Sequence, residues 1–86
     1  MAEASDSIRR RAASIVLGRL GEEMMGVVEH HLRRSYGISL KQEDSSKFSL
    51  EQLHFALSVL LGEGHANNLL RQITIEMEEI MREQVH

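Results

Sequence analysis

The sequence feature that most constrains the fold is a long run of helix-spaced apolar residues near the end of the chain. Its members recur at alternating spacings of four and three: Ala66, Leu70, Ile73, Met77 and Ile80. Because an α-helix turns once every 3.6 residues, this spacing places them on one face of a helix. About twenty residues in a helix span roughly 30 Å, the diameter of a small domain. The pattern therefore predicts a long final helix, over 65–84, against which shorter helices pack.

Composition restricts what can fill the core of the protein. The chain has 86 residues, with no cysteine, no proline, one tyrosine and two phenylalanines. Leu, Ile, Val and Met must therefore form the core, without disulfides or thiolate-bound metal. We expect one helical domain over 1–86, with 1–5 as a frayed leader. Because so short a chain buries only a modest core, association with another chain is a natural source of further burial.

The first two predicted helices cover 6–20 and 22–36. Ser5 or Asp6 can cap the first helix, because either side chain accepts a hydrogen bond from an amide of the first turn. Gly21 weakens helical structure between the two, and the alternative is one helix kinked at this glycine. The apolar face expected for the first helix consists of Ile8, Ala12, Ile15, Val16 and Leu20.

Glycines and polar caps mark the other helix boundaries. Gly37 is placed to end the second helix in the left-handed conformation that glycine adopts easily. Gly26 lies inside that helix, where close approach of another helix is the ordinary explanation. The third helix is predicted at 49–61, because Ser49 and Gln52 have the spacing of a capping box.

These segments together predict an all-α protein, a small four-helix bundle with a long C-terminal helix. The polar stretch 41–47 is the one clear loop. Gly64 is expected to permit the tight reversal into the final helix. Because the connection between the last two helices is short, they are expected to form an antiparallel pair.

The charges of the chain are unevenly distributed. Six basic residues stand against five acidic ones up to position 40, and four against eight beyond it, for a formal net charge of −3. This pattern favours oriented protein contact over general nucleic-acid affinity, which needs a concentrated basic surface. No apolar run approaches the roughly 20 residues of a membrane span, and the polar, acidic first residues do not form a secretory signal. We expect a cytoplasmic protein without membrane contact.

The five histidines are the residues best suited to chemistry, but their spacing favours structural roles. His30 and His31 are adjacent, so their side chains diverge by about 100° on a helix and cannot easily share one ion. A metal would need one of them together with His54 or His65 from another helix. No serine lies in the setting of a hydrolase nucleophile, and Gly62-Glu63-Gly64 lacks the Lys-Ser/Thr pair of a phosphate loop. We expect no metal, no other cofactor and no enzymatic activity.

An arginine-rich first helix supports an alternative function. Arg9, Arg10, Arg11 and Arg19 are candidates for contact with the phosphates of DNA, with Arg33 and Arg34 as an extension of that surface. The ordinary explanation of such a run is a solvated helix face. The alternative prediction is a DNA-binding transcriptional regulator.

Several short motifs occur in an order that resembles a known family. Over about residues 15–82 they are Leu20-Gly21-Glu22, His31-Leu32, Tyr36-Gly37-Ile38-Ser39-Leu40, Phe48, Leu61-Gly62-Glu63-Gly64 and Leu69-Leu70. In this order they resemble a small archaeal helical module, one of the archaeal "output domain" families, which are attached to signalling or regulatory chains or stand alone. The resemblance implies a signalling-output or protein-interaction role without enzymatic activity, and it carries over no catalytic residue.

The function favoured by these observations is protein interaction through helix–helix contacts, as a homodimer or with an unidentified protein partner. The reasons for this prediction are the long apolar stripe on the final helix and the small core that a single chain can form. The predicted interface consists of Leu70, Ile73, Met77, Ile80 and Met81. Ile75 lies on the opposite face of the same helix, where only a second surface could cover it.

Overall fold

The computed structural model describes residues 5–40 and 48–84, which form four α-helices and no strand. The helices are α1 (Asp6–Gly18), α2 (Glu22–Tyr36), α3 (Leu50–Leu61) and α4 (Glu63–Gln84). The predicted all-α, four-helix architecture is confirmed. The predicted loop at 41–47 and residues 1–4 of the predicted leader lie outside the described residues. None of the helices in the described ranges combines the length and hydrophobicity needed to cross a bilayer.

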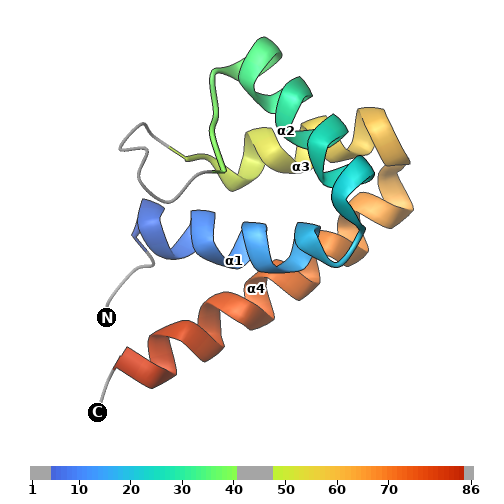
Figure 1. The fold of residues 1–86 in the computed structure, drawn as a ribbon. Coiled ribbons are helices and arrows are strands. Elements are labelled where there is room, and N and C mark those ends of the chain that lie inside the picture. The colour runs from blue at the N-terminus through green and yellow to red at the C-terminus, as the bar shows by residue number, and fades with distance from the viewer. Residues whose placement is uncertain (1–4, 41–47, 85–86) are drawn as a thin grey trace.

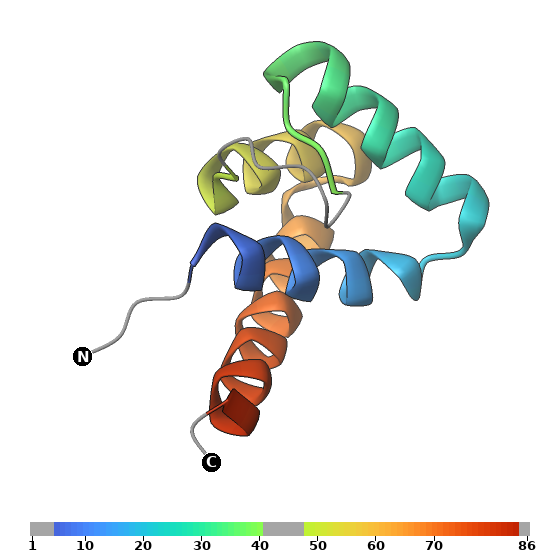
Figure 2. The same cartoon turned by 60° about the vertical axis from the view of Figure 1, so that its left-hand side comes forward.

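The long helix α4 is the common packing surface of two other helices. Both α1 and α3 pack extensively against α4, whereas α2 packs on α3 and contacts α1 less (Figure 1). α1 crosses α4 steeply, and the C-terminal half of α4 continues beyond this crossing, away from α2 and α3 (Figure 2). This arrangement agrees with the packing role predicted for the final helix.

Glycines with positive φ angles separate the helices. Gly21 has a φ of 99°, which a right-handed helix cannot contain, so α1 and α2 are separate helices rather than one kinked helix. α1 ends at Gly18, two residues before the predicted boundary. Gly62 has a φ of 94° and makes the reversal that was predicted at Gly64. α4 therefore begins at Glu63, two residues earlier than predicted.

The cap predictions rest on local chemistry, and the structure agrees with them. Ser5 caps α1, where its Oγ accepts a hydrogen bond from the Ile8 amide at 3.3 Å. Ser49 caps α3 in the same way, with the Gln52 amide 3.3 Å from its Oγ. Gly37 ends α2 in the left-handed conformation, with φ 65° and ψ 23°. Each cap satisfies a backbone group that a helix end leaves free.

The hydrophobic core is formed by side chains from all four helices and from the segments on either side of 41–47. Its buried side chains are Ala12, Ala13, Val16, Leu17, Val28, Leu32, Ile38, Leu40, Phe48, Leu53, Ala56, Leu57, Ala66, Leu69, Ile73 and Ile80. The buried face of α1 is rotated from the predicted one, because Ala13 and Leu17 are fully buried whereas Ile15 is 39% exposed. With this rotation Arg10, which shares the face of Ala13 and Leu17, points into the molecule and is buried.

Residues 38–40 leave α2 as a buried segment without regular secondary structure that rests on α1. The Arg10 Nε donates a hydrogen bond to the Ser39 carbonyl oxygen at 2.8 Å. The Ser14 Oγ donates another to the Leu40 carbonyl oxygen at 2.9 Å. Because both acceptors are main-chain atoms, α1 fixes the backbone of this segment directly.

Phe48, on the other side of 41–47, also rests on α1. Its backbone amide donates a hydrogen bond to Asp6 Oδ2 at 3.4 Å, and its ring lies 5.4 Å from the Arg10 guanidinium carbon. Such a cation–ring contact is favourable in a partly desolvated setting. Arg10 of α1 therefore contacts the chain on both sides of 41–47, at Ser39 and at Phe48.

Candidate interaction site

The predicted interface on α4 is largely used within the single chain. Ile73 is fully buried and Ile80 is 6% exposed, and both belong to the core. The other predicted interface residues, Leu70, Met77 and Met81, are half-buried. Ile75 is 53% exposed on the opposite face of the helix. A second chain could therefore reach only the half-buried part of the stripe, and the outer face of α4 presents an apolar residue of its own.

The four arginines predicted to contact DNA do not gather into one free basic surface. Arg10 is 2% exposed and holds the segment after α2. Arg9 forms an ion pair with an aspartate one turn earlier, at 2.9 Å, and Arg19 lies 3.6 Å from the Glu76 carboxylate of α4. Arg11 is exposed. Two of these arginines therefore have a structural role: Arg10 attaches α1 to the segment after α2, and Arg19 attaches it to α4.

This distribution leads to a prediction about DNA. We expect no binding to duplex DNA at moderate salt, because the arginines of α1 do not form a concentrated set of phosphate contacts and the exposed Arg33 and Arg34 of α2 supply only two more. A fluorescence anisotropy titration at several salt concentrations measures this directly. Binding at moderate salt with a steep negative salt slope would restore the DNA-binding alternative, and loss of that binding in Arg11→Ala would locate it.

His31 of α2 and His54 of α3 make contacts with protein groups. The His31 ring meets the edge of the Tyr36 ring, with centroids 5.9 Å apart. His54 Nε2 lies 2.6 Å from Asn67 Oδ1, and this hydrogen bond joins α3 to α4. His30 and His65 are exposed. Within residues 5–40 and 48–84, no three His, Asp or Glu side chains are placed to hold one metal ion.

An exposed aromatic patch lies over the junction of α2 and α3, and the sequence analysis did not identify it. We define the aromatic patch as His31, Tyr36, Phe55 and Val59. Phe55 and Val59 are each 62% exposed, one helical turn apart on α3. The Tyr36 ring joins the two helices, because it makes edge contacts with His31 of α2 and with Phe55 of α3, at centroid distances of 5.9 and 6.5 Å.

A shallow depression lies at the α3 end of the aromatic patch. Its volume is about 390 Å³, and it is lined by Tyr36, Ser49, Glu51, Gln52 and Phe55. Two of these residues are aromatic and three are polar, so the lining of the depression is divided between aromatic and polar side chains. This division is typical of protein–protein interfaces, where the centre excludes water and the rim supplies hydrogen bonds.

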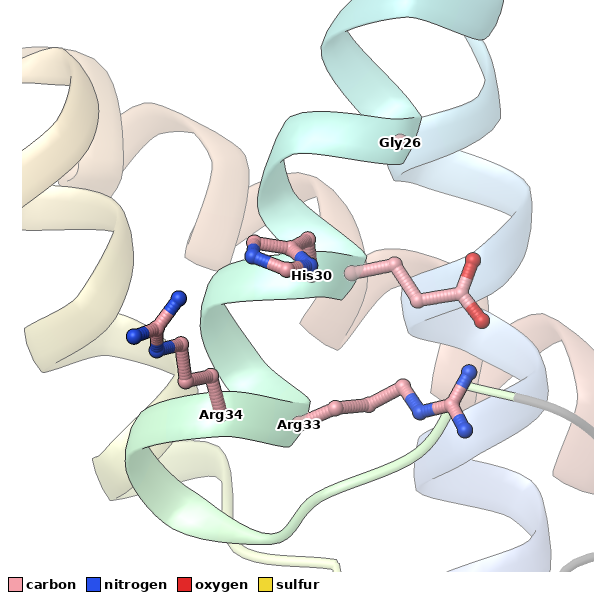
Figure 3. Close-up of a pocket in the computed structure, with 5 residues that line it drawn as sticks. Gly26, His30, Arg33 and Arg34 are labelled. Atoms are coloured by element: carbon pink, nitrogen blue, oxygen red, sulfur yellow. The ribbon is translucent and has the colours of Figure 1, made fainter.

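A second hollow lies on the outward face of α2. It has a volume of about 610 Å³ and is lined by Gly26, Glu29, His30, Arg33 and Arg34 (Figure 3). Gly26 is exposed, and a Cβ atom placed there would meet nothing within 4 Å. The predicted close approach of another helix is therefore absent among the residues that the structure describes. A glycine inside a helix costs about 1 kcal/mol relative to alanine, and no intramolecular contact of Gly26 offsets this cost.

Comparison with known proteins gives no family for this chain. No protein-family model matches it, and no curated protein or solved structure is significantly similar to it. The resemblance to archaeal output-domain modules therefore stays a prediction. The side chains exposed on the surfaces of the helices are the remaining evidence for function.

Proposed function

We propose that this protein is a non-enzymatic protein-interaction module, active as a homodimer, that binds an apolar helical segment of a partner protein on the aromatic patch. The observation that carries this proposal is the exposure of Phe55 and Val59, each 62%, beside the Tyr36 ring. A signalling-output role, which the sequence resemblance implies, is one form of such binding. The proposal assigns no catalytic residue.

Covering the aromatic patch would release a large amount of apolar surface from water. Full burial of one Phe or Val side chain is worth about 1.5–3 kcal/mol in transfer free energy. The Phe55 and Tyr36 rings meet edge to face at an interplanar angle of 77°, a favourable arrangement for aromatic pairs. Because this contact already orients the Phe55 ring, less side-chain entropy is lost when a partner binds.

The arrangement of the aromatic patch favours a helix as the bound segment. Phe55 and Val59 stand one turn apart, so their exposed surface runs along α3 rather than across it. A partner helix with apolar residues at spacings of three and four presents a matching stripe. Glu51 and Gln52 at the rim are exposed and can contact the polar flank of such a helix.

The homodimer part of the proposal follows from the size of the chain. A core of this size is small for an independent domain, and association adds buried surface. Because Ile73 and Ile80 are already covered within one chain, the contact between copies must use other exposed residues. Val27 and Ile75, which are 52% and 53% exposed, are available for this purpose.

Replacement of Phe55 by serine tests whether the aromatic patch binds a helix. We expect a displayed library of amphipathic helical peptides, selected on the wild-type protein, to yield binders with apolar residues three and four positions apart. Phe55→Ser should weaken their binding by at least about 30-fold, since truncation of a central aromatic contact costs about 2 kcal/mol or more. Isothermal titration calorimetry measures the change, and circular dichroism should show an unchanged helix content because Phe55 is exposed.

Ile15→Ser is the matched control, since Ile15 is an exposed apolar residue of α1 outside the aromatic patch. It should leave peptide binding unchanged. The aromatic patch is excluded as a helix-binding site if the selection yields no helical binders, or if the selected peptides bind Phe55→Ser as tightly as the wild type.

A further inference from the structure

The shallow depression at the α3 end of the aromatic patch is lined by groups that attract a cation. The Tyr36 and Phe55 rings have electron-rich faces, and Glu51 adds a carboxylate, which accepts hydrogen bonds and donates none. Ser49 and Gln52 complete the lining with neutral polar groups. None of the described residues that line the depression is a lysine or an arginine. The depression therefore has the chemistry of a site for a positively charged side chain.

The carboxylate of Glu51 is exposed, and no cation of the described chain pairs with it. Glu51 is the only acidic residue of α3, which contains no lysine or arginine. Arg33 and Arg34, the basic residues nearest to Tyr36 in the sequence, line the separate hollow on α2. Because Glu51 lies in the first turn of α3, the partial positive charge of the helix N-terminus offsets part of its negative charge. The aromatic rings must therefore supply part of the attraction for a cation.

The arrangement of the two rings favours a guanidinium group. The Tyr36 and Phe55 rings are inclined at 77° with their centroids 6.5 Å apart, and Phe55 is 62% exposed. A cation within about 6 Å of a ring centroid is attracted to the face of the ring. A planar guanidinium can stack on a ring and also donate two parallel hydrogen bonds to a carboxylate such as that of Glu51. An arginine therefore fits this lining better than a lysine.

The depression lies in line with the apolar part of the aromatic patch. Glu51, Phe55 and Val59 recur at spacings of four and are all exposed, so they form one ridge along α3. Each step along this ridge is about 6 Å, the rise of four residues in a helix. A helix that lies along the ridge contacts Phe55 and Val59 with its apolar stripe and reaches Glu51 about one turn beyond that stripe.

We propose that the helical segment bound by the aromatic patch carries an arginine one turn from its apolar residues, and that the guanidinium of this arginine occupies the depression. It lies against the Tyr36 and Phe55 rings and pairs with the Glu51 carboxylate. In a segment parallel to α3 the arginine precedes the apolar residues by three or four positions, and in an antiparallel segment it follows them. This inference rests on the proposed function and specifies the bound segment, because Glu51 rejects an acidic residue at the same position.

Peptide selection tests the charge preference. The library consists of displayed helical peptides with apolar residues at spacings of three and four and with randomised flanking positions. Selection on the wild type should enrich arginine, and less strongly lysine, one turn from the stripe. Selection on Glu51→Arg should enrich glutamate or aspartate there, because the reversed charge repels a cation. Glu63→Arg should retain the wild-type preference, since Glu63 is likewise an exposed acid in the first turn of a helix but does not line the depression.

Citrulline, the neutral isostere of arginine, separates the charge of the bound residue from its shape. In a selected peptide, replacing the arginine by citrulline should weaken binding to the wild type at least about fivefold, because both an ion pair and a cation–ring contact are lost. With Glu51→Gln the same replacement should weaken binding only about twofold, since the ring contact alone remains. Glu63→Gln should keep the fivefold ratio. Isothermal titration calorimetry measures these affinities, and circular dichroism checks that each variant is folded.

Selected helical peptides without an excess of arginine or lysine beside the stripe overturn this inference. Equal affinities of the arginine and citrulline peptides for the wild type overturn it as well. Peptides that depend on Phe55 but ignore Glu51 retain the aromatic patch as a helix-binding site and remove only the cation site. A selection that yields no helical binders removes the proposed function and this inference with it, so the two failures are distinguishable.

Discussion

Replacing Ile73 with aspartate is expected to unfold the protein at room temperature. Ile73 is fully buried in the middle of α4, the helix against which α1 and α3 both pack. Loss of the side chain costs about 2–5 kcal/mol through the cavity it leaves, and burial of an unpaired carboxylate adds several more. A small domain has a total free energy of unfolding of about 5 kcal/mol or slightly more, so this loss exceeds it. Far-ultraviolet circular dichroism should show loss of the helical signal and of a cooperative melt.

Thr74→Asp is the control for this experiment, because it places the same side chain one residue further along, on exposed surface. Its melting temperature should stay within a few degrees of the wild type. Ile80→Asp should also lower the melting temperature, since Ile80 is 6% exposed, but the distal position leaves more room for the carboxylate to reach water. A wild-type melt for Ile73→Asp would contradict the packing of α4 described above.

Arg10→Ala is expected to have the second largest effect, a loss of about 3 kcal/mol in the free energy of unfolding. The substitution removes a buried charged hydrogen bond to the Ser39 carbonyl, worth about 1.5–3 kcal/mol. It also removes the contact with the Phe48 ring, worth about 1–2 kcal/mol. For a domain of this size the melting temperature should fall by about 12–24 °C. Thermal denaturation followed by circular dichroism measures the shift.

Two substitutions make the Arg10 experiment specific. Arg11→Ala changes the neighbouring arginine, which is exposed, and should shift stability by no more than about 0.5 kcal/mol. Arg10→Lys keeps the charge but not the planar guanidinium, so an intermediate loss is expected. Equal effects of Arg10→Ala and Arg11→Ala would show that the arginine run acts only through its net charge.

The features predicted correctly from the sequence depend on residues close together in the chain. Ser5, Ser49 and Gly37 act on backbone groups within a few positions, so their residue types and spacing suffice to locate helix ends. The four-three periodicity of α4 likewise depends only on the geometry of one helix. The prediction that Gly64 makes the reversal into the final helix is wrong, because the positive φ lies at Gly62, and residue type alone does not distinguish two glycines that are two positions apart.

The features that escaped prediction depend on residues far apart in the chain. Arg10 shares the face of Ala13 and Leu17, but its burial depends on a carbonyl group 29 residues away at Ser39. How much of the α4 stripe one chain covers also depends on distant residues: Ile73 and Ile80 are buried within the chain, whereas Leu70, Met77 and Met81 are half-buried.

The aromatic patch shows the same dependence on distant residues. Phe55 and Val59 are four apart on α3, opposite its leucine-rich face, and this spacing is a signal that can be read from the sequence. What the sequence lacks is the position of Tyr36. The ring of that residue reaches Phe55 only because α2 lies alongside α3. A pair of apolar residues on the otherwise polar side of a helix, such as Phe55 and Val59, is therefore a better first candidate for a binding surface than a long apolar stripe that the fold itself can bury.

The packing of α1 on α4 has a consequence for synthesis on the ribosome. α1 emerges first, yet one of its main partners is the last of the four helices to be made. At roughly 5–20 residues per second, several seconds pass between the two. During that interval the Ala13–Leu17 face of α1 has no α4 to cover it. Folding of this bundle is therefore completed after translation of α4 rather than helix by helix.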